Sequence, residues 1–234
     1  MNKNTKSAFT LIELLVVISI IAILAGIALP AFSQVQVRGK QTKDLSNAKQ
    51  VYLACKLFAT DNNGLYPNMD GQVSPNTAIS GNGSGSSANE IYACLFPNYL
   101  TTEDIFYQAY PGGWCSVVPN NNIATAANIL PAGTNNFGYM FGLTDTSNPN
   151  YPLIFDAPNT ATTQYPTTGK GGLWNGAKAV MVFCDGHGGV MNVDPTSMNV
   201  LGNTGQATTA DVLTPTSATP AWMSATTNSV LYPN

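Results

Sequence analysis

The apolar stretch near the amino terminus constrains this chain more than any other feature. No residue from Leu14 to Phe32 is charged. As a helix, these roughly 19 residues are about 28 Å long, close to the roughly 30 Å hydrocarbon core of a bilayer. A signal anchor and a cleaved secretory signal peptide are the ordinary interpretations. A secretory signal is cleaved after its apolar run, whereas here the small residue Ala8 precedes the run.

Glu13 is the one carboxylate at the start of this stretch. An acidic residue in the centre of a membrane span costs roughly 2.5–3.5 kcal/mol, so such a residue indicates a functional site. Cleavage between Ala8 and Phe9 would create a cation, the new amine of Phe9. One helix is poorly placed to bring its first residue onto its fifth side chain, so we expect a neighbouring copy to supply the amine. Glu13 is therefore predicted to be an assembly residue.

Residues 8–14 (Ala-Phe-Thr-Leu-Ile-Glu-Leu) resemble the processing site of type IV prepilins and type II secretion pseudopilins. The resemblance implies cleavage after Ala8 by a prepilin peptidase, N-methylation of Phe9, and neutralisation of a neighbour's amine by Glu13. Pro30 stands where these families often carry a helix-kinking proline and is a second predicted assembly residue. Ala8 is a departure, because the family usually has glycine there.

The resemblance also implies the partners and the location of the chain. The partners are identical or homologous pilin subunits, the prepilin peptidase and an inner-membrane assembly platform. The protein would lie in the inner membrane before assembly, and afterwards in a periplasmic or cell-surface filament. The positive-inside rule gives no clear orientation, because Lys3 and Lys6 precede the span while Arg38, Lys40 and Lys43 follow it.

Charge is distributed unevenly along the chain. The net charge is −3, but seven of the nine basic residues lie within residues 1–56 and ten of the twelve acidic residues lie after them. An acidic globular part is a poor candidate for binding nucleic acid through its phosphates. We expect no nucleic-acid partner.

The segment after Pro30 is predicted to continue the helix. Its apolar residues recur at helical spacing, which predicts an amphipathic helix with one face toward a core. Asp44 and Lys49 are expected mostly between the apolar positions. The apolar positions are Leu45, Ala48, Val51, Tyr52, Cys55 and Phe58. Asn63 and Gly64 provide the left-handed conformations that end a helix, so the whole element would cover about 50 residues.

The remaining chain reads as short strands and long loops. Strands are predicted at residues 105–107, 137–141 and 152–155, and a hairpin at residues 178–193 turns at Asp185-Gly186-His187. Asn89 is a candidate cap for a short helix, and residues 195–234 are expected to be an irregular tail. The hairpin resembles the carboxyl-terminal part of a large group of prepilin-like proteins. Many of these carry a histidine where this chain has Asn175.

The sequence provides little support for a catalytic site or a metal-binding site. His187 is the only histidine, and a turn residue held by local hydrogen bonds is the favoured interpretation over a catalytic or metal-binding pair with Asp185. Calcium stays possible because major pseudopilins bind it. No residues can be assigned to such a site, and we expect neither a cofactor nor enzymatic activity.

Four cysteines allow three pairings. A Cys94–Cys115 disulfide, closing a short loop, is the first choice for a protein beyond the cytoplasmic membrane. Cys55 and Cys184 either pair or remain buried thiols.

We expect an α+β, pilin-like fold in which a long amino-terminal helix packs on a small antiparallel sheet with long loops. The predicted divisions are a leader (1–8), a transmembrane and assembly half of the helix (9–32), an amphipathic half (33–60) and a periplasmic or extracellular globular domain (61–234). The predicted function is a structural subunit of a type IV pilus-like filament, with a type II secretion pseudopilin favoured. A membrane-tethered binding module or enzyme that uses the same amino terminus only for targeting is the alternative.

Overall fold

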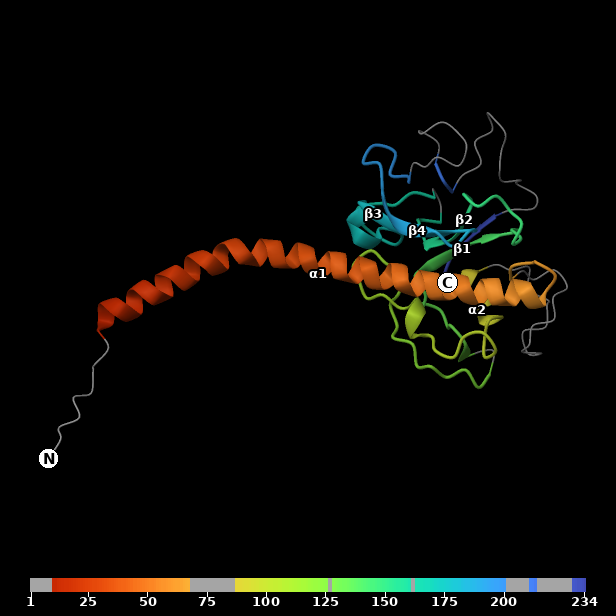
Figure 1. Ribbon diagram of the computed structural model, residues 1–234, viewed down its shortest axis with the longest axis horizontal. Helices are drawn as coiled ribbons and strands as arrows, with labels where there is room; N and C mark the ends of the chain where they lie inside the picture. The colour runs from red at the N-terminus through yellow and green to blue at the C-terminus, as the bar shows by residue number, and fades with distance from the viewer. Residues whose placement is uncertain (1–9, 68–86, 126–127, 161–162, 201–210, 214–228) are drawn as a thin grey trace. The chain divides into compact units, whose positions relative to one another are not determined.

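The computed structural model describes residues 10–67, 87–125, 128–160, 163–200, 211–213 and 229–234 (Figure 1). The chain divides into two compact units, residues 1–40 and 41–234. Helix α1, Leu11–Asp61, contributes to both units.

Helix α1 has the length that the sequence predicts, with 51 residues in one element. It continues across Pro30; the kink expected there stays a prediction. It ends as expected, because Asn63 and Gly64 adopt positive φ angles of 55° and 80°. The Gly64 amide donates to the Ala59 carbonyl at 2.8 Å, which pairs a carbonyl that the last turn leaves without a helical donor.

The part of α1 in the second unit buries the predicted apolar face. Five of the six predicted positions are buried, and Leu45 is partly buried against the same core. The prediction for Asp44 was wrong, because its side chain is 1% exposed. The reason is helical spacing: Asp44 precedes Ala48 by four residues and Val51 by seven, which places all three on one face.

The sheet has five antiparallel strands in the order β4-β3-β2-β1-β5. They are β1 Phe137–Phe141, β2 Pro152–Asp156, β3 Lys178–Phe183, β4 Gly188–Asn192 and β5 Ser229–Leu231. The six-residue helix α2, Ala88–Ala93, and a 3₁₀ helix, Asp104–Phe106, lie between α1 and β1 in the chain, and a second 3₁₀ helix, Leu173–Gly176, lies between β2 and β3. In Figure 1 the part of α1 after residue 41 runs beside the sheet. The predicted α+β fold is confirmed, with buried residues of α1, α2 and the strands forming one core.

The β3–β4 hairpin forms at the predicted turn. Val180 faces Val190 across the two strands, and the Gly186 amide donates to the Phe183 carbonyl at 2.9 Å. Gly186 has a φ of 84°, and a Cβ placed there would lie 2.7 Å from Cε1 of Tyr52. Glycine is needed for both reasons, since a side chain would strain the turn and push against α1.

Three local predictions are corrected by the structure. The strand expected at 105–107 is instead the 3₁₀ helix Asp104–Phe106. Ser87, not Asn89, caps α2, because the buried Asn89 side chain donates to the Leu130 carbonyl at 2.9 Å. The tail is not irregular throughout: β5 pairs with β1, and the carbonyls of Tyr232 and Asn234 accept hydrogen bonds from Ala88 and Gly133. Residues 201–210 and 214–228 lie outside the described part of the chain.

Candidate functional site

The first turn of α1 holds the Glu13 carboxylate in place. Oε2 of Glu13 accepts hydrogen bonds from the backbone amide of Thr10 at 2.8 Å and from its hydroxyl at 2.7 Å. The Glu13 amide donates to the Thr10 hydroxyl at 3.3 Å in return. This is the reciprocal arrangement of a capping box, which pairs amides that the start of a helix leaves without partners. Oε2 is thus engaged, whereas Oε1 of Glu13 has no donor among the described residues.

The predicted processing residues Ala8 and Phe9 lie outside the described residues. The Thr-x-x-Glu spacing that the structure uses is visible in the sequence, yet the sequence argument paired Glu13 only with an amine. Thr10 is therefore a residue that the pattern of the capping box could have identified. It orients the carboxylate without supplying the positive charge that would neutralise it.

The helical segment that follows Glu13 presents apolar side chains on all sides. Helix α1 is long and apolar enough to cross a membrane, and its most apolar window has no buried residue. Between Leu14 and Phe32, the described leucine, isoleucine, valine and phenylalanine side chains are exposed, from 47% for Val17 to 71% for Ile27. Monomeric soluble proteins rarely expose an apolar surface of this extent. Lipid or other apolar helices are the surroundings that such a surface fits.

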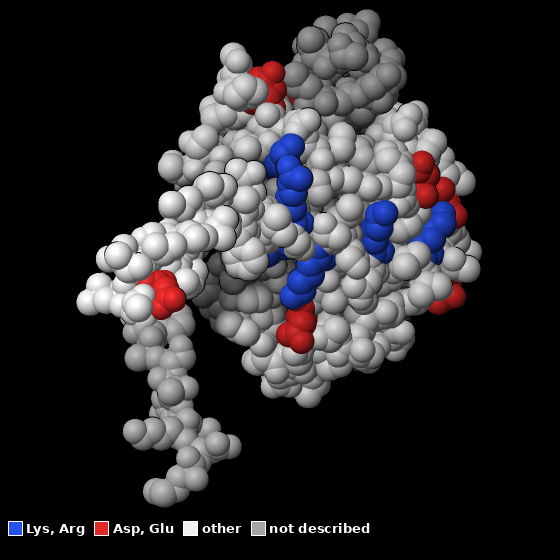
Figure 2. All heavy atoms as spheres, turned by 60° about the vertical axis from the view of Figure 1, so that its left-hand side comes forward, with Lys and Arg blue, Asp and Glu red and all other residues white. Residues whose placement is uncertain are grey.

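Basic residues follow the apolar segment directly. Arg38, Lys40, Lys43 and Lys49 have exposed side chains on α1. Figure 2 shows that lysine and arginine side chains are accessible on the face it presents, with acidic side chains mostly near its edges. A helix that changes from uncharged to basic within a few residues has the pattern of a segment leaving a membrane for water.

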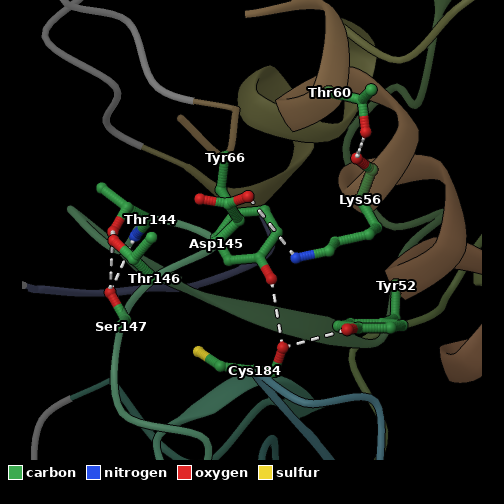
Figure 3. A network of polar contacts seen from close by, with 9 residues as sticks. All are labelled: Tyr52, Lys56, Thr60, Tyr66, Thr144, Asp145, Thr146, Ser147 and Cys184. Carbon is green, nitrogen blue, oxygen red and sulfur yellow. Dashed lines mark hydrogen bonds and ion pairs between the residues drawn. The ribbon is translucent and has the colours of Figure 1, made fainter. Parts of the chain in front are cut away.

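Polar contacts attach the end of α1 to the β3–β4 turn (Figure 3). The hydroxyls of Tyr52 and Tyr66 both donate to the carbonyl of Cys184, at 2.9 Å and 3.2 Å. Burial raises the pKa of both tyrosines, which keeps these hydroxyls as donors at neutral pH. Lys56 lies 3.7 Å from Asp145, a half-exposed pair of the kind that contributes at most about 1 kcal/mol. Tyr52 therefore connects α1 to the β3–β4 turn, Tyr66 connects the segment after α1 to the same carbonyl, and the Lys56 pair reaches the segment between β1 and β2.

The predicted Cys94–Cys115 disulfide is absent from this structure, in which none of the four cysteines is in a disulfide. Each thiol donates instead to a backbone carbonyl, Cys94 to Glu90 at 3.6 Å and Cys115 to Phe106 at 3.7 Å. Burial raises the pKa of Cys115 to about 12. Since disulfide exchange proceeds through the thiolate, this environment lowers the reactivity of the Cys115 thiol. Cys55 and Cys184 are both buried and free, which agrees with the expectation that they remain buried thiols if they do not pair.

His187 is held within its own turn. Its amide donates to Oδ1 of Asp185 at 2.9 Å, its Nδ1 contacts the same oxygen, and its ring stacks on Phe183 with centroids 4.3 Å apart. The described residues contain no group of three or more histidine, cysteine, aspartate or glutamate side chains that could hold a metal ion. The surroundings of His187 are those of a turn residue.

Two buried aspartates are a further feature of the globular unit that sequence reasoning missed. Asp44 on α1 and Asp156 at the end of β2 are 1% and 0% exposed, and their carboxyl groups lie within hydrogen-bonding reach. The recurring spacing of four and three residues from Asp44 through Ala48, Val51 and Cys55 is the sequence signal that places Asp44 on the buried face.

Comparisons with known proteins found one family model and several relatives. Residues 3–29 match the family model of the prokaryotic N-terminal methylation motif. The type IV major pilin protein PilA of Myxococcus xanthus (strain DK1622) is 49% identical over 53 residues, which is 23% of this chain and 24% of that protein. A probable minor fimbrial protein of Dichelobacter nodosus is 32% identical over 117 residues, which is 47% of this chain and 74% of that protein. No solved structure matches the chain.

Proposed function

This chain belongs to the family of type IV pilins and minor fimbrial proteins, and we propose from this membership that it is a structural subunit of a type IV pilus-like filament. The observation that carries the proposal is the uncharged, exposed surface of α1 with one carboxylate at its start. In the membrane this surface contacts lipid, and in a filament it contacts the same surface of other copies. The same helix can therefore anchor the subunit in the membrane and later contact other subunits in the filament.

Processing supplies the charge that Glu13 needs. Cleavage after Ala8 exposes the amine of Phe9, which is methylated in a separate step, and Glu13 becomes the fifth residue of the mature chain. Thr10 already occupies Oε2 of the carboxylate, while Oε1 can accept a further donor. The amine of an adjacent subunit is the donor that we assign to it. Each added subunit then brings one amine and one carboxylate, and both are neutralised only in the assembled filament.

A pilus is favoured over a type II secretion pseudopilus because the relatives are a type IV major pilin and a probable minor fimbrial protein. The pseudopilus is the second candidate, because residues 63–67 (Asn-Gly-Leu-Tyr-Pro) resemble the segment after the long helix in major pseudopilins. Shearing intact cells distinguishes the two: a surface pilus releases the subunit into the medium, whereas a periplasmic pseudopilus retains it. Inner-membrane insertion before assembly is common to both.

The mature amino terminus tests the processing step directly. We expect mass spectrometry of protein from native cells to find a terminal peptide that begins at N-methylated Phe9. Replacing Ala8 with glycine should leave processing at least as complete, since it restores the residue usual in the family. Ala8→Leu should make the precursor accumulate. A mature chain that begins at Met1, or after the apolar run, would contradict the filament proposal.

The outward face of α1 in the globular unit provides a second test. Leu53 and Leu57 are each 58% exposed on the helix face opposite the core. Burying them against another copy would add roughly 25 cal/mol for each Å² of apolar surface removed from water. We expect Leu53→Ser combined with Leu57→Ser to lower filament yield about tenfold, a loss of roughly 1.4 kcal/mol per contact, without changing the Tm.

Val117 and Val118 provide the matched control for these leucines. They are 50% and 66% exposed in a loop that is not part of α1, so changing both to serine removes exposed apolar surface of a similar kind. Filament yield should then stay near the wild-type value. Equal losses in the two double variants would show that exposed apolar residues in general, and not this helix face, govern assembly.

A further inference from the structure

The carboxyl groups of Asp44 and Asp156 present an electrostatic problem that the fold has to solve. Both side chains are almost completely buried and lie within hydrogen-bonding reach of each other. Oδ2 of Asp44 and Oδ1 of Asp156 are buried and lack a hydrogen-bond donor among the described residues. Two adjacent carboxylates cannot both stay ionised in such a site, because burial and mutual repulsion each disfavour the second charge.

We infer that Asp44 and Asp156 share one proton, so that a carboxylic acid on α1 donates a hydrogen bond to a carboxylate on β2 and fastens the helix to the sheet in a pH-dependent way. One proton provides the missing donor for both unpartnered oxygens. It also reduces the charge of the pair from two to one.

The neighbouring groups determine which aspartate is ionised. Oδ2 of Asp156 accepts hydrogen bonds from Nε1 of Trp174 at 2.8 Å and from the amide of Val180 at 2.8 Å, and both stabilise the carboxylate form. No hydrogen bond from an N–H group is recorded to Asp44 within the described chain. Asp44 is therefore the acid that donates, and Asp156 is the carboxylate that accepts.

The other titratable groups around the pair do not remove the need for a proton. Lys43 on α1 lowers the pKa of Asp44, but burial and the Asp156 charge, which raise it, are larger. Cys115 and Tyr165 lie near Asp44 and Asp156 respectively, and both are themselves held protonated by burial. The Tyr165 hydroxyl donates to the backbone carbonyl of Asp156 at 2.8 Å and not to the carboxylate.

A metal ion is the other way to neutralise two carboxylates, and the geometry disfavours it. Calcium takes six to eight oxygen ligands, whereas one oxygen of Asp156 already faces two N–H groups. No third acidic, histidine or cysteine side chain joins the pair in a metal-binding group among the described residues.

Stability should therefore fall as the pH rises. Burial raises the pKa of Asp44 well above its usual range and that of Asp156 to about 6. Both groups titrate near pH 4 in the unfolded chain. The folded state thus binds protons more tightly, so the contribution of the pair is greatest below about pH 4 and is lost as the pH rises through the folded-state values.

The test compares thermal unfolding of the full-length protein in detergent micelles from pH 4.5 to 8.5. We expect the wild-type Tm to fall by roughly 5–10 °C across this range. Asp44→Asn should make the Tm nearly independent of pH over this range. At pH 8.5 the variant should unfold at a higher temperature than wild type, because the introduced side-chain amide donates a hydrogen bond to Asp156 without needing a titrating proton. Asp194→Asn is the matched control, since Asp194 is partly exposed and hydrogen bonds from the amides of Ser197 and Thr196 lower its pKa, away from the tested range.

Two outcomes would overturn the shared proton. One is a wild-type Tm with the same pH dependence as the Asp44→Asn variant. The other is a Tm that falls on adding a chelator and recovers with calcium, which would identify a metal ion between the carboxylates. Should Asp44→Asn fail to fold, infrared spectroscopy of the wild-type protein decides. The C=O stretching band of a protonated carboxylic acid should persist at neutral pH, and its absence would refute the inference.

Discussion

Glu13→Ala is expected to abolish filament assembly while leaving membrane insertion intact. We expect the variant protein in membrane fractions at the wild-type amount and filament yield in shear fractions to fall at least tenfold, a loss of about 1.4 kcal/mol or more per added subunit. Insertion depends on the apolar surface from Leu14 to Phe32, which the substitution does not touch. Assembly depends on the charge that the substitution removes.

The expected size of this loss of assembly follows from the burial of charge within the filament. Removing one partner of a buried ion pair typically costs 3–5 kcal/mol, because the remaining charge is left without compensation. In Glu13→Ala the remaining charge is the amine of the neighbouring Phe9. Every subunit contact along the filament repeats this cost, so even the lower bound of the range is enough to prevent growth.

Variants close to Glu13 separate charge from helix capping. Thr10→Ala keeps the carboxylate but removes the hydroxyl that accepts from the Glu13 amide and donates to Oε2, so we expect a partial loss of assembly. Ser19→Ala is the matched control, because the Ser19 hydroxyl donates only to the Leu15 carbonyl at 2.7 Å within the same helix. Normal filaments from Glu13→Ala would contradict the proposal and favour a membrane-tethered binding module or enzyme.

The long helix could be predicted from sequence because its signals are local. An uncharged run, apolar residues at helical spacing and the Asn63-Gly64 stop all lie within one continuous segment, and the structure places α1 at Leu11–Asp61. The β3–β4 hairpin was predictable for the same reason, since Asp185-Gly186 lies between two short runs rich in apolar residues. Each of these elements depends on neighbours in the chain.

The features that sequence reasoning missed depend on partners far away in the chain. β5 forms because residues 229–231 pair with the edge of β1, about ninety residues earlier in the chain. Asp44 lies on the buried face of α1, and the carboxyl group that it meets there, that of Asp156, comes from a different element. A polar residue on an apolar helix face is ambiguous until its partner is known. Cys94 and Cys115 are free thiols in this structure, and the spacing between cysteines in the sequence does not determine where their side chains point.

Asn136→Ala is expected to cause the largest loss of stability among single substitutions in the globular unit. The Asn136 side chain is 1% exposed and lies just before β1. Its Oδ1 accepts from the amides of Trp114 at 2.6 Å and Cys115 at 3.0 Å, and its Nδ2 donates to the Gln108 carbonyl at 2.7 Å. Alanine leaves all three backbone groups without a partner.

The expected cost can be built from these three groups. A buried backbone group left unpaired costs roughly 1–3 kcal/mol, so the variant should lose about 3–5 kcal/mol of the free energy of unfolding. A typical domain has only about 5–15 kcal/mol in total. For a domain of this size, the loss corresponds to a fall in Tm of roughly 8–15 °C, measurable by the near-ultraviolet circular dichroism of the tryptophans.

Asn148→Ala distinguishes this mechanism from the loss of any asparagine. The exposed Asn148 accepts one hydrogen bond from the Asn150 amide at 3.0 Å, so its replacement should change stability by no more than about 0.5 kcal/mol. A loss below about 1 kcal/mol for Asn136→Ala would mean that water pairs the freed groups. The segment 108–115 would then have to be held to β1 mainly by packing of Trp114, whose Nε1 donates to the Ala157 carbonyl at 3.1 Å.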